Sequence, residues 1–377
     1  MKALSCAFWA LILIVIAGCG GSSTAPQIDL VYAAGQGQNA IQGFSLRQDG
    51  TLQALTVSSF GTNPRPVALA FTPAKTFVYV ANDTSNTVSG FSVDHTSGVL
   101  TPVGTAVPPT PICPATLPPT VTCSTPINVG VSSNGQFLFS LNQGSSNISV
   151  FNIDARGLLS PVAGSPFPAP ANPQFMAVSP NANFVYVSAA NTIVTLPFST
   201  SGVIGAAAST FTSPTAGATI KGTAIDNKGQ FLYATDSTNN QLLSLSVQSS
   251  GVLSLVGPPS ATGTTPVNAA VDFTGNFVYS SNQGSNDVSA FKANAGVLTA
   301  VSGSPFITAA TGATGVALTT APGYLTTDTT NGFLLVSNTG TRSITVFGID
   351  PTNGSLVQAP NSPFGQAFAP DWILVSN

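Results

Sequence analysis

Side chains capable of acid–base or metal chemistry are scarce in this sequence. The 377 residues include one histidine, His95, no glutamate, and only 6% charged residues. His95 lies in DHTSG (94–98), which is typical of a solvated turn, and Asp83, Asp236 and Asp287 lie far apart in polar segments. Solvated turn residues are the main interpretation, and a calcium site built from isolated aspartates is the alternative. We therefore expect no metal, no cofactor and no catalytic constellation.

The charge distribution excludes nucleic acid as a partner. The formal net charge is −3, and the nine basic residues are scattered singly along the chain. Binding to a phosphate backbone needs several clustered lysines or arginines. We expect no nucleic-acid partner.

The first nineteen residues predict a lipoprotein signal. Lys2 precedes an apolar stretch that is too short to span a bilayer, and the stretch ends in IAGC (16–19), which resembles the bacterial lipobox. This resemblance implies cleavage after residue 18 and acylation of Cys19, which would anchor the chain in a lipid bilayer. Residues 19–27 would form the tether, and the absence of Asp after Cys19 favours the outer membrane. An ordinary secretory signal is the alternative.

Two further cysteines predict a disulfide. Cys6 leaves with the signal, so Cys113 and Cys123 remain, both in a segment rich in Pro and Thr (108–125). In an oxidising compartment, two such thiols most often form a structural bond. A metal or redox pair would need more ligands or a CxxC spacing, and the sequence has neither.

A fifteen-residue phrase recurs along the chain. FVYSSNQGSNDVSAF (277–291) has relatives at 77–91 and 137–151, and each consists of an apolar run, a polar turn and a second apolar run. Such a phrase predicts two strands joined by a hairpin turn. Seven copies can be aligned on the middle of the first strand, 46 to 60 residues apart: Tyr32, Tyr79, Phe139, Tyr186, Tyr233, Tyr279 and Leu335. A recurrence of this kind indicates a repeat architecture.

A complete copy has four strand-like segments, which is the composition of a propeller blade. An upstream apolar run such as PVALAF (66–71) and a downstream Gly-led run such as GVL (98–100) flank the phrase. We predict an all-β, seven-bladed β-propeller over residues 28–377. The first copy lacks the upstream run, and residues 370–375 supply one at the far end. The C-terminal strand is therefore expected to complete the first blade and close the ring.

The blade phrases resemble a known family. FVYVAN…NTVSGFSVD and the repeated Gly-Ser-Pro-Phe at 164–167 and 303–306 are similar to the YVTN-type and lactonase-like seven-bladed propellers, which include bacterial 6-phosphogluconolactonase. The resemblance implies the fold and, as a possible activity, lactone hydrolysis. That reaction needs a group that activates water and a donor or cation for the developing oxyanion. Metal-dependent gluconolactonase-like propellers use a Glu, which this chain lacks.

Residues at the start of the innermost strands are the candidates for a ligand site at the channel mouth. By register they are Arg65, Asn128, Gln174, Lys221, Asn268, Asp371 and Trp372. Arg65 and Lys221 could bind an anionic group, and Trp372 could stack on a sugar ring. The alternative is that Trp372 packs between blades, as Phe175 at the equivalent register suggests.

These observations favour a membrane-anchored, extracytoplasmic propeller that serves as a binding module. We expect it to be monomeric, with an envelope protein or a glycan bound at the loop face. A structural subunit of an envelope complex fits the same features. The alternative from another class is a lactonase that hydrolyses a sugar lactone, as 6-phosphogluconolactonase does. Fold alone does not decide between them.

Overall fold

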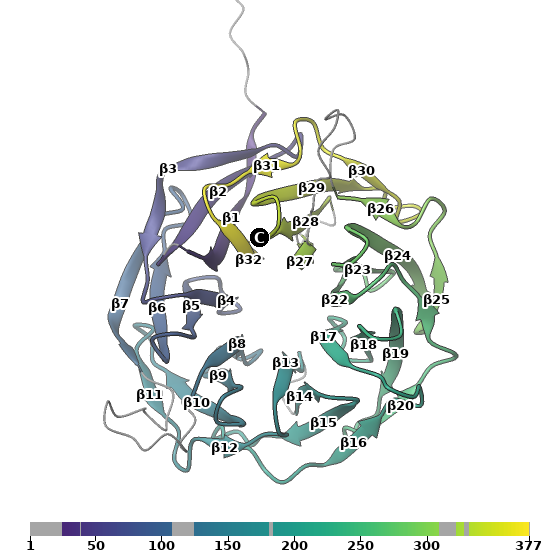
Figure 1. The fold of residues 1–377 in the computed structure, drawn as a ribbon. Coiled ribbons are helices and arrows are strands. Elements are labelled where there is room, and N and C mark those ends of the chain that lie inside the picture. Colours follow the sequence, from purple (N-terminus) through teal and green to yellow (C-terminus); the bar gives the residue numbers. More distant parts are fainter. Residues whose placement is uncertain are drawn as a thin grey trace, which may run out of the picture.

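The computed structural model describes residues 25–37, 39–107, 124–180, 184–308, 322–327 and 332–376, with the backbone alone for 322–327. Seven antiparallel sheets surround a central axis, as Figure 1 shows. The predicted all-β, seven-bladed propeller is confirmed. Blade 1 contains β32 and β1–β3, and blades 2 to 7 begin at β4, β8, β13, β17, β22 and β27.

The two inner strands of every blade contain the apolar runs of the repeat. The innermost strands are β4 (Pro66–Phe71), β8 (Pro126–Val131), β13 (Pro173–Val178), β17 (Ile220–Ile225), β22 (Pro266–Val271), β27 (Pro322–Thr327) and β32 (Ala369–Val375). The second strands are β1 (Gln27–Gln36), β5 (Phe77–Asn82), β9 (Phe137–Asn142), β14 (Phe184–Ala189), β18 (Phe231–Asp236), β23 (Phe277–Asn282) and β28 (Phe333–Asn338). Neighbouring blades cover both faces of these strands, which is why most of their residues are apolar on both faces.

The two outer strands are more polar. The third strands are β2 (Ala40–Arg47), β6 (Thr87–Val93), β10 (Asn147–Ile153), β15 (Thr192–Pro197), β19 (Gln241–Val247), β24 (Asp287–Asn294) and β29 (Ser343–Ile349). The outer strands are β3 (Leu52–Gly61), β7 (Leu100–Val107), β11 (Leu159–Pro161), β16 (Ser209–Thr212), β20 (Leu253–Leu255), β25 (Val297–Ala300) and β30 (Leu356–Gln358). Four blades add a two-residue piece that pairs with the third strand: β12 (Phe167–Pro168), β21 (Ser260–Ala261), β26 (Phe306–Ile307) and β31 (Phe364–Gly365).

The repeated Ser-Pro-Phe sequence lies where the outer strand is interrupted. The hydroxyls of Ser165, Ser304 and Ser362 each accept a hydrogen bond from a third-strand backbone N–H, at 2.8 to 2.9 Å. The hydroxyl thereby replaces the carbonyl that an uninterrupted strand would supply. This short sequence is therefore a structural feature of the blade edge.

The chain closes its ring as predicted. β32 pairs antiparallel with β1, with Ala34 opposite Trp372 and Val31 opposite Val375. In Figure 1 the yellow C-terminal strand completes the purple N-terminal blade. The Ser376 hydroxyl also donates to Asp29 Oδ1 at 3.1 Å.

Buried aromatic residues join successive blades. The tyrosine at the centre of a second strand is almost fully buried in five blades. The hydroxyl of Tyr79 donates to the carbonyl of Gly157 in the next blade at 2.9 Å, and Tyr32 does the same to Gly98 at 2.8 Å. Both glycines have positive φ, which a residue with a side chain rarely adopts. The repeated tyrosine and the Gly-led run are thus partners in one interblade contact.

The asparagine that ends the second strand is structural. Four copies, Asn82, Asn142, Asn282 and Asn338, are fully buried. In each, Nδ2 donates to a serine or threonine hydroxyl of the third strand at 2.8 to 2.9 Å. The hydrogen bond satisfies a buried amide N–H donor that would otherwise be costly. The repeated Asn therefore stabilises the hairpin and is not presented to solvent.

Candidate functional site

The loop face is the end of the propeller formed by the blade linkers and the turns between second and third strands. Arg65 lies on this face, in the linker before β4, with a positive φ of 57°. Its N–H donates to Asn39 Oδ1 at 3.3 Å, and its carbonyl accepts from the Asp83 N–H at 3.1 Å. The linker residues Thr125, Asn172 and Thr265 share the positive φ. Arg65 is thus the charged member of a structurally repeated position.

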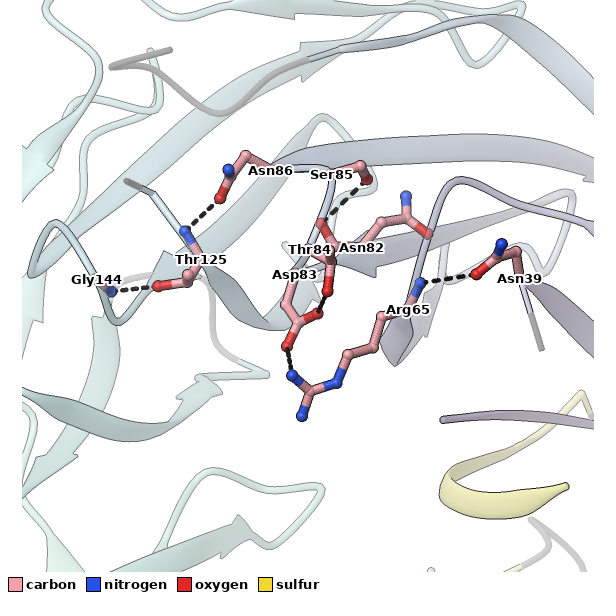
Figure 2. A network of polar contacts seen from close by, with 9 residues as sticks. All are labelled: Asn39, Arg65, Asn82, Asp83, Thr84, Ser85, Asn86, Thr125 and Gly144. Atoms are coloured by element: carbon pink, nitrogen blue, oxygen red, sulfur yellow. Dashed lines mark hydrogen bonds and ion pairs between the residues drawn. The ribbon is translucent and has the colours of Figure 1, made fainter. Parts of the chain in front are cut away.

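Arg65 forms an ion pair with Asp83. The guanidinium Nη1 lies 3.0 Å from Asp83 Oδ2, and 46% of the Arg65 side chain is exposed against 12% for Asp83. Figure 2 shows the Arg65 side chain extending from the linker toward Asp83 in the β5–β6 turn. Thr84 Oγ1 donates to the same carboxylate at 3.0 Å. The pair places a half-exposed cation beside an oriented carboxylate.

A second cation lies near the start of β17. Lys221 Nζ donates to Gln174 Oε1 of β13 at 2.9 Å, which links blades 4 and 5. Gln174 Nε2 in turn donates to the Asn172 carbonyl at 3.1 Å. Asp371, on β32 of blade 1, is half-buried. Arg65, Gln174, Lys221 and Asp371 therefore occupy the outer level of the mouth.

The other predicted mouth residues lie deeper. Three of them occupy the third position of an innermost strand, counted from its leading proline: Asn128, Asn268 and Trp372. All three line a cavity of about 390 Å³ inside the ring. A register shift follows Pro126 on β8 and Pro266 on β22. Such a bulge changes where the following side chains point. The structure thus divides the predicted site into two levels.

Trp372 packs in the interior of the ring. Its indole stacks on the Phe175 ring with centroids 5.8 Å apart and an interplanar angle of 16°. Trp372 belongs to blade 1 and Phe175 to blade 4, so the stack crosses the channel between blades that are not neighbours. Only 8% of Trp372 is exposed. Of the two interpretations of Trp372, packing inside the protein describes its position better than stacking on a bound sugar.

The remaining candidate carboxylates have structural surroundings. Asp236 replaces the repeated buried Asn in blade 5, and its carboxylate accepts from Asn239 Nδ2 at 2.8 Å and from the Thr219 N–H at 3.0 Å. Asp287 Oδ1 accepts from Asn282 Nδ2 at 2.6 Å. His95 is exposed in the β6–β7 turn, on the opposite face. Across the described residues, no three His, Cys, Asp or Glu side chains gather as metal ligands would.

Several N-terminal and cysteine predictions lie outside the described residues. They concern the signal (1–18), Cys19 with most of its tether, and the Cys113–Cys123 disulfide. These remain predictions. Within the described part of the chain, no helix combines the length and apolar character that crossing a bilayer requires.

Comparison with known proteins assigns the family. The model of the family described as "Lactonase, 7-bladed beta-propeller" matches residues 23–116 and 128–311. The chain belongs to this lactonase family. The resemblance deduced from the blade phrases is confirmed. No curated protein matches the sequence at a significant level.

Solved structures share the lactonase-family fold. A putative 6-phosphogluconolactonase from Bacteroides fragilis matches with a TM-score of 0.73 and 16% identity, covering 94% of this chain and 99% of its own. A putative 6-phosphogluconolactonase from Bacteroides uniformis matches with a TM-score of 0.74 and 18% identity, over 93% and 100% of the two chains. The Pseudomonas aeruginosa periplasmic gluconolactonase PpgL matches with a TM-score of 0.72 and 17% identity, over 92% and 98%. At such identities the likeness concerns the fold.

Sequence reasoning missed the partner of Arg65 in this lactonase-family propeller. Taken alone, Asp83 is typical of a solvated turn residue. The sequence did contain a sign of this contact, because blade 2 differs from the other copies at both the linker position and the turn position. Gln143 and Gln283 occupy the Asp83 position in blades 3 and 6, where uncharged residues also occupy the linker. Two opposite charges introduced in one copy indicate a contact.

Proposed function

We propose that this propeller hydrolyses a sugar lactone at its loop face. The observation that carries the proposal is the match of the lactonase family model over most of the ring. Two cations and one carboxylate at the loop face support it: Arg65, Lys221 and Asp83. The expected role as a binding module for a protein or glycan gains no support from the comparisons. The lactonase alternative is therefore the better interpretation.

Arg65 is suited to stabilising an oxyanion. Within the described residues, Asp83 is the side-chain partner of its guanidinium, through Nη1. The other guanidinium N–H groups can donate to a lactone carbonyl as negative charge develops on its oxygen. Asp83 keeps the guanidinium oriented and offers a carboxylate oxygen that can accept a proton from an attacking water. Lys221 can hold an anionic substituent of the sugar.

Hydrolysis is tested with the purified protein. We expect glucono-1,5-lactone or 6-phosphogluconolactone to release acid at a rate proportional to protein concentration and above spontaneous hydrolysis. A pH-stat measures the carboxylic acid formed. Heat-unfolded protein is the control. A rate equal to that of buffer with both lactones would count against the proposed activity.

We further propose that the protein is an extracytoplasmic lipoprotein, as the lipobox-like IAGC (16–19) supports. Cys19→Ser should abolish incorporation of labelled palmitate in a bacterial host, because the thiol is the site of diacylation. Cys113→Ser is the matched control and should keep the label. Persistent labelling of the Cys19→Ser variant would refute the anchor.

A further inference from the structure

The walls of the central channel are formed by strand edges. In the described part of the chain, each sheet ends at its innermost strand, so one edge of that strand has no strand partner and faces the channel (Figure 1). Such an edge presents a row of backbone N–H and C=O groups. Small residues at the fifth position of these strands do little to cover the edges: Ala70, Gly130, Ala177, Ala224 and Ala270. The accessible lining of the cavity is therefore polar as well as apolar.

The cavity opens at the face opposite the loop face. Leu69, at the fourth position of its strand, is buried, whereas Phe71 and Val271, at the sixth position, are partly exposed. The Trp372–Phe175 stack lies toward the other end. The volume of about 390 Å³ is in the range of small-molecule sites. A solute can therefore enter from the side of the β4–β5 turn.

Lys75 supplies the charge of this lining. It lies in the β4–β5 turn, and no other Lys, Arg, Asp or Glu lines the cavity among the described residues. Its side chain is partly buried, with Nζ 5.5 Å from the centroid of the Phe71 ring. Burial lowers the pKa of the Lys75 ammonium, an effect that the charge of Asp29 opposes. An ammonium that has lost part of its water attracts an anion more strongly than a fully solvated one.

The backbone at Lys75 is a second sign that its side chain has a role. Lys75 donates its N–H to the Thr72 carbonyl and has a φ of 59°. The same position of the turn is a glycine with positive φ in blades 3, 5 and 6: Gly135, Gly229 and Gly275. A side chain is disfavoured in this conformation, and glycine is not. Blade 2 therefore has a cation at the mouth of the cavity where the backbone favours glycine.

The carboxylates in the equivalent turns do not face the cavity. Asp226 Oδ1 accepts from the Phe231 N–H at 2.9 Å, and Asp272 Oδ1 accepts from the Phe277 N–H at 2.7 Å. Neither aspartate lines the cavity, and Asp29 does not line it either. The side-chain charge that faces the cavity is therefore positive.

We propose that the cavity binds the anion of a polyhydroxylated carboxylic acid, such as a six-carbon sugar acid. Lys75 binds the carboxylate at the open end. The hydroxyls, each of them both donor and acceptor, pair with the N–H and C=O groups of the strand edges, directly or through water. A purely aliphatic chain would leave those groups unpaired. Arg65, Asp83 and Lys221 do not line the cavity, so this site does not rest on the proposed lactone hydrolysis.

The test compares three probes on the intact protein by isothermal titration calorimetry. We expect gluconate to bind about tenfold more tightly than sorbitol, which lacks the charge, and than hexanoate, which lacks the hydroxyls. If the cavity only holds water, gluconate will not bind at millimolar concentration. An affinity for sorbitol or hexanoate equal to that for gluconate would also overturn the proposal. These comparisons need no variant.

Variants of Lys75 locate the site. Lys75→Gly has the residue that three other blades have in this turn, so it should fold, and it should weaken gluconate about tenfold or more. Lys75→Arg keeps the charge and should retain most of the affinity. Lys228→Gly is the matched control, because Lys228 is exposed in the β17–β18 turn on the same face and does not line the cavity. Unchanged gluconate affinity in the Lys75→Gly variant would refute the site.

A loop-face variant separates this site from the proposed lactone site. Arg65→Asn should bind gluconate as the unchanged protein does, because Arg65 does not line the cavity. Lactone turnover should in turn be unchanged in the Lys75→Gly variant. Loss of gluconate binding in the Arg65→Asn variant would place the acid at the loop face and overturn the proposal.

Discussion

Replacing Arg65 by asparagine should lower kcat/KM for the lactone about a hundredfold or more, because an oxyanion donor is lost. Asparagine is the suitable replacement. Asn172 holds the equivalent linker position in blade 4 with a φ of 50°, so the backbone accepts this residue. The measurement is kcat/KM in the pH-stat assay, with urea unfolding to show that stability is kept.

Arg156→Asn is the matched control for this variant. Arg156 also pairs with an aspartate, Asp154 at 3.0 Å, but it lies in the β10–β11 turn on the opposite face. We expect its turnover to equal that of the unchanged protein. Full activity in the Arg65→Asn variant would refute the role given to Arg65, while lactone hydrolysis by the propeller would stand.

Removing the C-terminal strand should have the largest effect on stability. Deletion of residues 369–377 takes away the inner strand of blade 1 and exposes the edge of β1. Ile373 is fully buried and Trp372 nearly so. Since truncating one large buried side chain costs about 2–5 kcal/mol, losing the strand should cost more than about 5 kcal/mol. The free energy of unfolding in urea measures this loss.

A milder variant keeps the test useful if the truncated chain fails to fold. Ile373→Ala should lower the free energy of unfolding by about 2–5 kcal/mol. Val357→Ala, at a side chain that is 69% exposed on β30, is the control and should change it by less than about 0.5 kcal/mol. Equal stability of the two variants would show that closure of the ring contributes little.

The Trp372–Phe175 stack and the cavity below it both result from the sizes of the side chains on the innermost strands. Trp372 and Phe175 meet because the channel is narrow enough for two large rings to span it from blades 1 and 4. Small residues elsewhere on the innermost strands, such as Ala70 and Ala270, leave the cavity below the stack. Large rings at one level and small side chains at the next thus leave the cavity inside the ring.

The blades, their number and the closure of the ring could all be predicted from residue patterns along the chain. Tyr79 and its equivalents recur because each blade must bury the same aromatic residue against the next one, and this need leaves a local, countable pattern. The Pro-led run at residues 370–375 predicted closure of the ring, because it is the innermost strand that the first copy lacks. The family followed from the same repeated phrases.

How the candidate site residues combine depends on the three-dimensional fold. Asn128 lies one position further along its innermost strand than Gln174 does, and closure of the ring brings Trp372 to Phe175. Lys75 reaches the cavity because its turn lies beside the end of β4. These contacts depend on strand register and on distances across the ring, which no local pattern of residue types encodes.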